Sequence, residues 1–224
     1  MSEFDLFATN YKQLLDKSLA ISGDSSEYFA DYKARYTATS VSNGFSGKVL
    51  DFGCGVGLGS KFLRKYLPAA TLHGFDDSSA SIQQIDPSLS IQGLYTSDIR
   101  HLNHDYDLIV VANVMHHIPP QSRQETVIDL KDRLAKNGKL LVFEHNPANP
   151  LTRWVVSRCP LDKDAILLSP KEIQAYTQYA RLRLVRMAYI MFFPRPLALA
   201  RPLEPYLSWC ALGAQYVLIA EKTN

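Results

Sequence analysis

The spacing of hydrophobic positions changes near residue 46. Over residues 1–45 apolar side chains such as Tyr11 and Leu14 recur at helical spacing, and serine and aspartate precede the stretch "EYFADYKARY" as a capping signal. After that, short apolar runs ending in glycine or an acid alternate with amphipathic stretches, which is typical of β-α-β units. The pattern predicts an N-terminal helical cap over 1–45 and an α/β domain over 46–224.

Seven apolar runs predict seven strands. They are "KVLDFG", "ATLHGF", "SLSIQGLYTSD", "YDLIVVANV", "KLLVFEHN", "RLVRMAYIMFF" and "AQYVLIAEK". A helix after the fourth run places Val127, Leu130 and Leu134 on one face and is predicted to end at Asn137-Gly138, while "SPKE" predicts another helix from Pro170. The last two runs lie close enough in sequence to pair antiparallel. We therefore expect a mostly parallel sheet with an antiparallel edge strand.

Composition and charge narrow the classes of protein. A hydrophobic content of 46% with 21% charged residues indicates a globular chain, and a net charge of +2 with scattered basic residues gives no support for a nucleic-acid partner. The three cysteines lie far apart and predict reduced thiols. The most apolar region, residues 187–220, is broken by prolines and charges, so we expect no stable membrane insertion and a cytoplasmic protein. The oligomeric state stays open.

The stretch "VLDFGCGVGLGS", residues 49–60, carries the first chemical signal. A strand that runs into glycines and then a helix presents backbone N–H groups to a ligand at the end of the sheet. The order "GSK" does not match the phosphate loop of NTPases, and Leu58 or Ser60 stands where a dinucleotide fingerprint needs its third glycine. What remains is an acid at the strand end, Asp51, followed by glycines at alternate positions.

That stretch resembles motif I of the class I S-adenosylmethionine-dependent methyltransferases, including its cysteine. Further matches follow in order at "HGFDDS", "TSDI" and "YDLIVVANVMHHI". The stretch after the fifth predicted strand is similar to one in a bacterial small-molecule subgroup of that family. The resemblance implies a Rossmann-like, doubly wound sheet, S-adenosylmethionine as cofactor, and O- or N-methylation of a small molecule, with a saccharide or a secondary metabolite as candidate acceptors.

The resemblance also assigns cofactor contacts residue by residue. Asp76 would hold the ribose, and Asp98 and Ile99 would lie beside the adenine. The glycine loop would pack against the methionine portion of the cofactor. The full set that it implies for the cofactor is Asp51, Gly53, Cys54, Gly55, Gly57, Asp76, Asp98, Ile99 and Asn113.

Candidates for the acceptor side follow the fourth and fifth predicted strands. His117 is preferred to His116, because successive side chains of an extended segment point to opposite sides, and His145 is the second candidate base. A structural role for either histidine stays open. Residues predicted to contact the substrate are Tyr28, Glu144, Asn146 and Arg153, with packing an alternative for Tyr28 and an orienting role an alternative for Glu144. The adjacent histidines have no metal-ligand spacing, so no metal is expected.

Two other classes of function remain as alternatives. A nicotinamide-dependent oxidoreductase would bind NADH, although the dinucleotide fingerprint is incomplete. A non-catalytic subunit that keeps the cofactor fold would bind S-adenosylmethionine without turnover.

Overall fold

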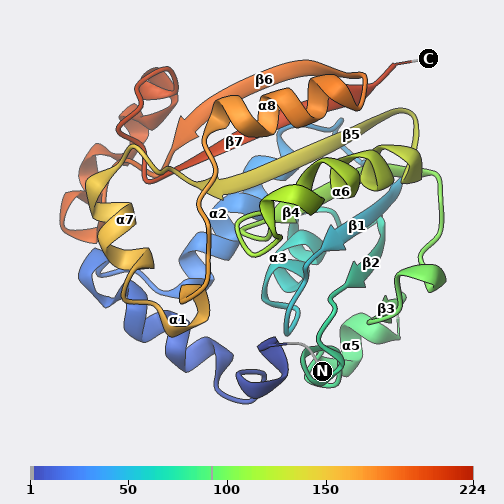
Figure 1. The fold of residues 1–224 in the computed structure, drawn as a ribbon, viewed down its shortest axis with the longest axis horizontal. Helices are drawn as coiled ribbons and strands as arrows, with labels where there is room; N and C mark the ends of the chain where they lie inside the picture. Colours follow the sequence, from blue (N-terminus) through green and yellow to red (C-terminus); the bar gives the residue numbers. More distant parts are fainter. Residues whose placement is uncertain (1–2, 92, 224) are drawn as a thin grey trace.

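The computed structural model describes residues 3–91 and 93–223 (Figure 1). The strands are β1 (Lys48–Phe52), β2 (Thr71–Phe75), β3 (Tyr95–Thr96), β4 (Tyr106–Ala112), β5 (Leu134–His145), β6 (Leu182–Ile190) and β7 (Gln215–Lys222). The α-helices are α1 (Tyr11–Leu19), α2 (Ser26–Ala38), α3 (Leu58–Tyr66), α4 (Ser79–Ile82), α5 (Pro87–Ser90), α6 (Pro120–Arg133), α7 (Pro150–Val156) and α8 (Pro170–Tyr179). The 3-10 segments are η1 (Glu3–Leu6), η2 (Ala20–Ser22), η3 (Ile99–His101), η4 (Pro160–Asp162) and η5 (Arg195–Leu207).

The strands form one seven-stranded sheet in the order β3-β2-β1-β4-β5-β7-β6. Neighbouring pairs from β3 to β5 are parallel, whereas β7 pairs antiparallel with both β5 and β6. The predicted doubly wound, mostly parallel sheet with an antiparallel edge pairing is therefore confirmed. The strand whose direction is reversed is β7, which lies one place inside the edge strand β6.

Each face of the sheet has its own apolar core. Side chains of α6 and α8, including Leu130 and Ile173, pack with Leu50 and Ile109 of the strands on one face. On the other face α2 and α3 pack against alternate strand residues such as Val110. Figure 1 shows the two pairs of helices on opposite sides of the sheet. Strands covered on both faces explain the nearly continuous apolar runs in the sequence.

The helical cap shares a core with the sheet. Ser25 caps α2 by accepting a hydrogen bond from the backbone N–H of Tyr28, which confirms the capping signal. Ala34 of α2 is buried in the same cluster as the β1 residue Val49. Residues 1 and 2 of the predicted cap lie outside the described residues.

Two predicted elements differ from the structure. The third run, residues 88–98, begins in the short helix α5, which Asp86 caps by accepting a hydrogen bond from the N–H of Ser88, and only Tyr95–Thr96 pairs in the sheet. Asn137-Gly138 does not end the preceding helix. That helix, α6, stops at Arg133, and Asn137, with φ of 63°, lies in β5 where its register against β4 shifts. The helix predicted from Pro170 is confirmed, with its Ser169–Glu172 capping box.

The segment between β6 and β7 is built on η5, a 3-10 segment with Pro202 and Pro205 inside it. Proline removes a backbone donor, which explains why this stretch does not form a regular α-helix. Among the residues that the structure describes, no helix combines the length and apolar character that crossing a bilayer requires.

Two glycines with left-handed backbone allow a matched test of the packing around the β1 loop. Gly53 has φ of +76°, and a Cβ there would lie 2.2 Å from Cγ2 of Val114, whereas Gly44 has φ of +74° and open space. Gly44→Ala should cost about 1–2 kcal/mol of unfolding free energy for the backbone alone, and Gly53→Ala about 2–4 kcal/mol.

The measurement is urea unfolding of both variants without ligand. Adding Val114→Ala to Gly53→Ala should restore part of the loss. Equal costs for the two glycine variants would contradict the close packing at Gly53.

Candidate active site

The loop after β1 turns sharply through glycine. Gly53, Gly55 and Gly57 all have positive φ, and Gly57 stands at the N-terminal cap of α3. The N–H groups of Gly53 and Cys54 both donate to the carbonyl oxygen of Phe75, which fixes the loop against the end of β2. A Cβ at Gly55 would meet no atom within 4 Å, so the loop leaves open space there that a ligand could fill.

Asp76 closes the side of this space. Its Oδ2 accepts from the N–H of Gly55 at 2.8 Å and its Oδ1 accepts from the N–H of Ser78 at 3.0 Å. Burial raises the pKa of the Asp76 carboxyl, while the two backbone hydrogen bonds lower it. The carboxylate therefore stands beside the loop with lone pairs left for a hydroxyl donor.

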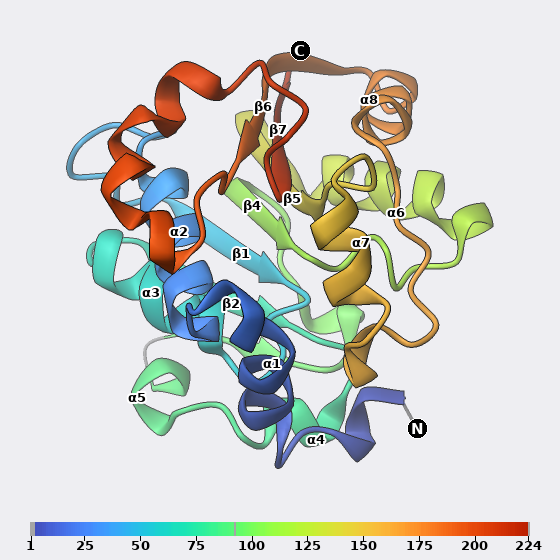
Figure 2. The same cartoon turned by 90° about the vertical axis from the view of Figure 1, so that its left-hand side faces the viewer.

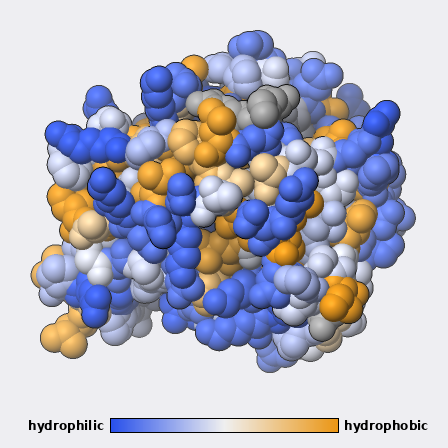
Figure 3. Space-filling view, turned by 90° about the horizontal axis from the view of Figure 1, so that it is seen from below, coloured by the Kyte–Doolittle hydropathy of each residue, from blue (hydrophilic) through white to orange (hydrophobic). Residues whose placement is uncertain are grey.

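We call the space between the loop and Asp76 the loop cavity, about 370 Å³ in volume. It also has Phe75 and Ile118 in its lining. The surface seen from below is hollowed near its centre, with apolar side chains in the hollow and hydrophilic ones around it (Figure 3).

A second space, the histidine cavity of about 150 Å³, lies between the sheet and the cap. Its walls come from α1 and α2 on one side and from β4, β5 and the segment after α7 on the other. The two cavities share five lining residues, namely Tyr11, Gly53, Ala112, Asn113 and His117. A molecule in one cavity would therefore lie next to a molecule in the other.

Asp51 lies beneath the glycine loop and lines the histidine cavity. Its Oδ2 accepts from the Ser60 hydroxyl at 2.7 Å. Burial raises the pKa of Asp51 to about 6, against the lowering effect of that hydrogen bond. The side chain thus ties the loop to the first turn of α3.

Glu144 holds the loop that follows β4. Its Oε1 accepts from the N–H groups of Val114 and Met115 at 3.0 and 2.7 Å, and its Oε2 lies 2.6 Å from Nδ1 of His116. The side chain is fully buried and lies outside the lining of both cavities. This placement supports the orienting role of Glu144, and its contact with substrate stays a prediction.

Asp162, from η4, brings the two adjacent histidines together. Its Oδ1 lies 3.4 Å from Nε2 of His116 and 3.4 Å from Nε2 of His117. Burial opposes a charge on His116, but Glu144 and Asp162 overcome it and raise its pKa to about 9. The pKa of Asp162 falls well below its usual range because the histidines outweigh its burial. The cluster is an ion pair in which one imidazolium lies between two carboxylates.

Within the described ranges, these three residues also place ligand atoms within 4.8 Å of one another, as a metal site requires. No metal-ligand spacing is visible in the sequence because Asp162 is distant from the two histidines along the chain. The expectation that the protein uses no metal stays a prediction.

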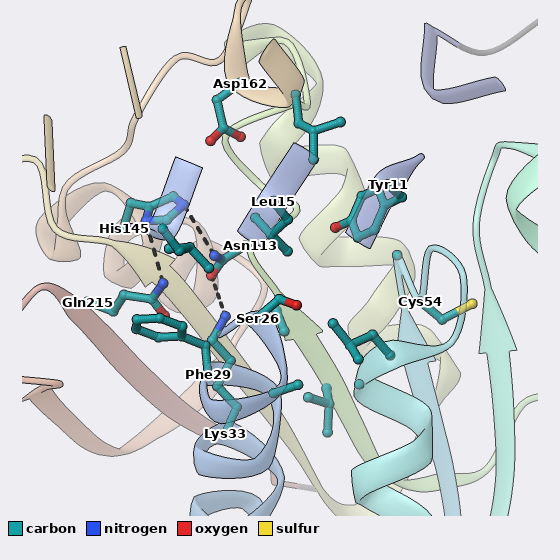
Figure 4. Close-up of a pocket in the computed structure, with 18 of the residues that line it drawn as sticks. Tyr11, Leu15, Ser26, Phe29, Lys33, Cys54, Asn113, His145, Asp162 and Gln215 are labelled. Carbon is teal, nitrogen blue, oxygen red and sulfur yellow. Dashed lines mark hydrogen bonds between the residues drawn. The ribbon is translucent and has the colours of Figure 1, made fainter. Parts of the chain in front are cut away.

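A hydrogen-bonded chain crosses the other wall of the histidine cavity (Figure 4). Nζ of Lys33 donates to Oδ1 of Asn113 at 2.9 Å, and Nδ2 of Asn113 lies 3.2 Å from Nε2 of His145. Burial lowers the pKa of Lys33 to about 8, with acidic neighbours opposing the change. Burial and His116 lower the pKa of His145 to about 3, so its ring is neutral and Nε2 accepts from Asn113.

The remaining predicted residues lie elsewhere. Tyr28 packs under Arg201, whose guanidinium carbon lies 4.2 Å from the ring centroid, which supports the packing alternative. Asn146 is fully buried and donates to the carbonyl oxygens of Ala211 and Gly213. Arg153 is exposed on α7. None of these three residues is in the lining of either cavity, and their contact with substrate stays a prediction.

Three predicted cofactor residues do not direct side chains into the cavities. The Cys54 side chain packs with Ile85 and Leu89, and its sulfur points away from the histidine cavity in Figure 4. Asp98 caps η3 and pairs with Arg100 at 2.6 Å, and neither it nor Ile99 lines either cavity. The adenine assignment stays a prediction.

Four residues that line the histidine cavity are not among the predicted site residues, namely Tyr11, Lys33, Asp162 and Gln215. Lys33 lies within the cap helix, and the spacing of apolar residues in that helix does not indicate that Lys33 faces a cavity. Asp162 follows "NPLTRWVVSRCPL", where the unusual composition was the one available signal.

Comparisons with known proteins add a family and a fold. The sequence matches the family model described as "Methyltransferase domain" over residues 24–193. A comparison with curated protein sequences gives no match.

Among solved structures, the magnesium protoporphyrin IX methyltransferase of Synechocystis PCC 6803 with bound SAH has a TM-score of 0.67 at 15% identity, covering 98% of this chain and 97% of that chain. The Haloferax volcanii complex that contains the Trm112 methyltransferase activator gives 0.69 at 15%, covering 100% and 99%. The [4+2]-cyclase SpnF gives 0.69 at 13%, covering 98% and 94%. At these identities the likeness shows the fold.

The ion-paired histidine predicts a pH dependence of stability. Because the folded pKa of His116 is raised to about 9, its stabilisation is complete below the unfolded value of 6.5 and is lost as the pH rises through 9. The unfolding free energy lost on His116→Gln should therefore shrink between pH 6.5 and 9.

Urea unfolding at pH 6.5, 8 and 9 measures this loss, with the exposed His101→Gln as the control. Titrating groups that do not interact with His116, such as Lys33, behave alike in both proteins and drop out of the difference. A loss that is independent of pH would contradict the charged state of His116.

Proposed function

This chain belongs to the methyltransferase domain family, and from that premise we propose that it is an S-adenosylmethionine-dependent methyltransferase that methylates a small molecule at oxygen or nitrogen. The observation that carries the proposal is the shared wall of the two cavities. A cofactor in the loop cavity and an acceptor in the histidine cavity would meet at Asn113 and His117. Methyl transfer needs two molecules held in line at close range.

The residues of the loop cavity fit this cofactor. Bound there, it supplies a methyl group on a positively charged sulfonium, with a neutral thioether as the leaving group. Across the described ranges, the linings of the two cavities hold one lysine and four carboxylates, Asp51, Asp76, Asp77 and Asp162. This excess of acid favours a cationic ligand and opposes the pyrophosphate of a nicotinamide dinucleotide.

Individual residues take distinct roles toward the cofactor. The Gly55 position gives space for close approach, and Asp76 accepts from ribose hydroxyls through its remaining lone pairs. Asp98 and Ile99 keep the adenine role that the family resemblance implies. Asp51 acts from beneath the loop, because its side chain is tied to Ser60.

On the acceptor side His117 is the better candidate for the base. It lines both cavities, and Asp162 lies 3.4 Å from its Nε2, where a carboxylate stabilises the imidazolium that forms on proton uptake. His145, with a pKa of about 3, is a weak base. We therefore assign His145 and Asn113 to binding the acceptor, and Lys33 to fixing Asn113.

Cofactor binding tests the first half of the proposal. Calorimetric titration should give micromolar affinity for S-adenosylmethionine and S-adenosylhomocysteine and no heat with NADH. Asp76→Asn should weaken S-adenosylmethionine binding by about 1–3 kcal/mol, because a ribose hydroxyl loses its acceptor.

Asp132→Asn, an exposed change at the far end of α6, is the control and should leave the affinity unchanged. No binding of either sulfur compound, or normal binding by Asp76→Asn, would overturn the respective assignment. Binding without turnover on any acceptor would favour the non-catalytic alternative.

Turnover tests the second half. With methyl-labelled S-adenosylmethionine and a panel of small hydroxylated and amino compounds, His117→Ala should lower kcat by about 10²–10⁴-fold through loss of a general base, with cofactor affinity kept. His101→Ala, an exposed histidine outside both cavities, should leave kcat unchanged. An unchanged kcat for His117→Ala would show that no base acts there.

A further inference from the structure

Large apolar side chains are exposed along η5 and α7. Leu199 is 100% exposed, and Tyr206 and Trp209 are 77% and 78% exposed. The set, which we call the apolar face, is Leu151, Trp154, Leu197, Leu199, Leu203, Tyr206, Trp209 and Leu212. Clusters of this kind on a soluble domain mark a contact surface.

Specific contacts hold η5 in this position. Oε1 of the buried Glu204 accepts from the N–H groups of Phe192 and Phe193, and its Oε2 accepts from the Tyr32 hydroxyl at 3.1 Å. Arg201 donates to Asp24 at 2.6 Å. The segment is therefore fixed against the cap, and its outward leucines are part of the folded surface.

The two elements that carry the apolar face are joined. Nδ2 of Asn149, at the start of α7, donates to the carbonyl oxygen of Leu212, and the Thr152 hydroxyl donates to that of Ala214. Figure 2 shows η5 (red) and α7 (gold) on the side of the molecule that faces the viewer, together with α1 and α2. Both elements thus lie on one side of the molecule.

The exposed charges within residues 150–161 and 194–214 have one sign. Arg153, Arg158 and Arg195 are exposed, and Arg158 lies over the Trp154 ring at 4.1 Å. The one acid within residues 150–161 and 194–214 is Glu204, which is 5% exposed and turned inward. Arginine beside exposed tryptophan, tyrosine and leucine is the composition of surfaces that bind anionic lipid headgroups and the layer beneath them.

The apolar face also borders the histidine cavity. Val155 of α7 and Cys159 just after it line that cavity, as do Phe29 and Lys33 of α2, the helix against which η5 is held. Docking through η5 and α7 would bring these walls close to the docked surface.

We propose that the apolar face docks this protein on the surface of an anionic phospholipid bilayer. Leucine and aromatic side chains enter the interfacial layer, and the arginines contact the headgroups. The position of the histidine cavity then favours an acceptor that is itself a membrane-borne amphiphile, a consequence that rests on the proposed function. Docking itself is independent of methyl transfer.

The chain offers a direct probe, because both of its tryptophans, Trp154 and Trp209, belong to the apolar face. Vesicles of equal parts phosphatidylglycerol and phosphatidylcholine should shift tryptophan emission to the blue and carry the full-length protein into the pellet. Brominated acyl chains should quench the emission. Pure phosphatidylcholine should bind more weakly, and added salt should weaken binding to the anionic vesicles.

Leu199→Glu with Leu212→Glu should lower vesicle affinity by about tenfold or more, since two apolar contacts are lost and two like charges face the headgroups. Ile91→Glu is the matched control, because Ile91 is 83% exposed but lies outside the apolar face. Circular dichroism and S-adenosylmethionine affinity, which should stay unchanged in both variants, report correct folding.

Three outcomes would overturn the proposal. They are no emission shift with anionic vesicles, equal vesicle binding by the double variant and wild type, and a concentration-dependent emission shift without lipid that accompanies dimer formation in sedimentation. The last would assign the apolar face to a second copy of the chain. Since none of these readouts requires methyl transfer, loss of vesicle binding and failure of the proposed activity are separate results.

Discussion

One buried carboxylate, that of Glu144, fixes the geometry on which both cavities depend. It lies at the end of β5 and takes hydrogen bonds from two backbone N–H groups and one imidazole of the loop after β4. Burying a carboxylate costs free energy unless hydrogen-bond donors satisfy its oxygens. Movement of the loop would break these hydrogen bonds and leave the buried charge of Glu144 unsatisfied. The positive φ of Asn113, and with it the direction of the Asn113 side chain, is held by the same anchoring.

The charge state of the cavity follows from this anchor. His116, held by Glu144, keeps its proton and attracts Asp162, and Asp162 in turn approaches His117. A protonated His116 next to His145 disfavours a second positive charge, which adds to burial in keeping His145 neutral. The histidines thus divide into a charged structural member, a neutral hydrogen-bond acceptor, and one that borders both cavities. Their environments, more than their residue type, separate their roles.

The predictable part of the site is the part that is local in sequence. A strand end, a glycine loop and a helix start lie within residues 49–60, so their spacing indicates how they fold, and the family resemblance adds Asp76 at the end of the next strand. Lys33 and Asp162 reach the site from segments about 80 residues before and 50 residues after the β4 loop at Asn113, and no local pattern encodes their approach. Asn146 shows the converse. Its position after β5 suggested contact with substrate. In the structure its side-chain amide instead donates to two backbone carbonyl oxygens of the segment before β7.

The difference between local and distant parts of the site also explains why the fold does not determine which acceptor is methylated. The [4+2]-cyclase SpnF has a similar fold, so the fold is compatible with more than one reaction. Part of the wall that would touch an acceptor comes from α1, α2 and the segment after α7, outside the β-α-β core. Helix α2, which holds η5 through Tyr32, supports the apolar face, and α7, which lines the cavity through Val155, carries part of it. The same short elements form the cavity wall on their inner side and the apolar face on their outer side. A movement of these elements when the apolar face makes a contact would therefore also move the side chains that would select the acceptor.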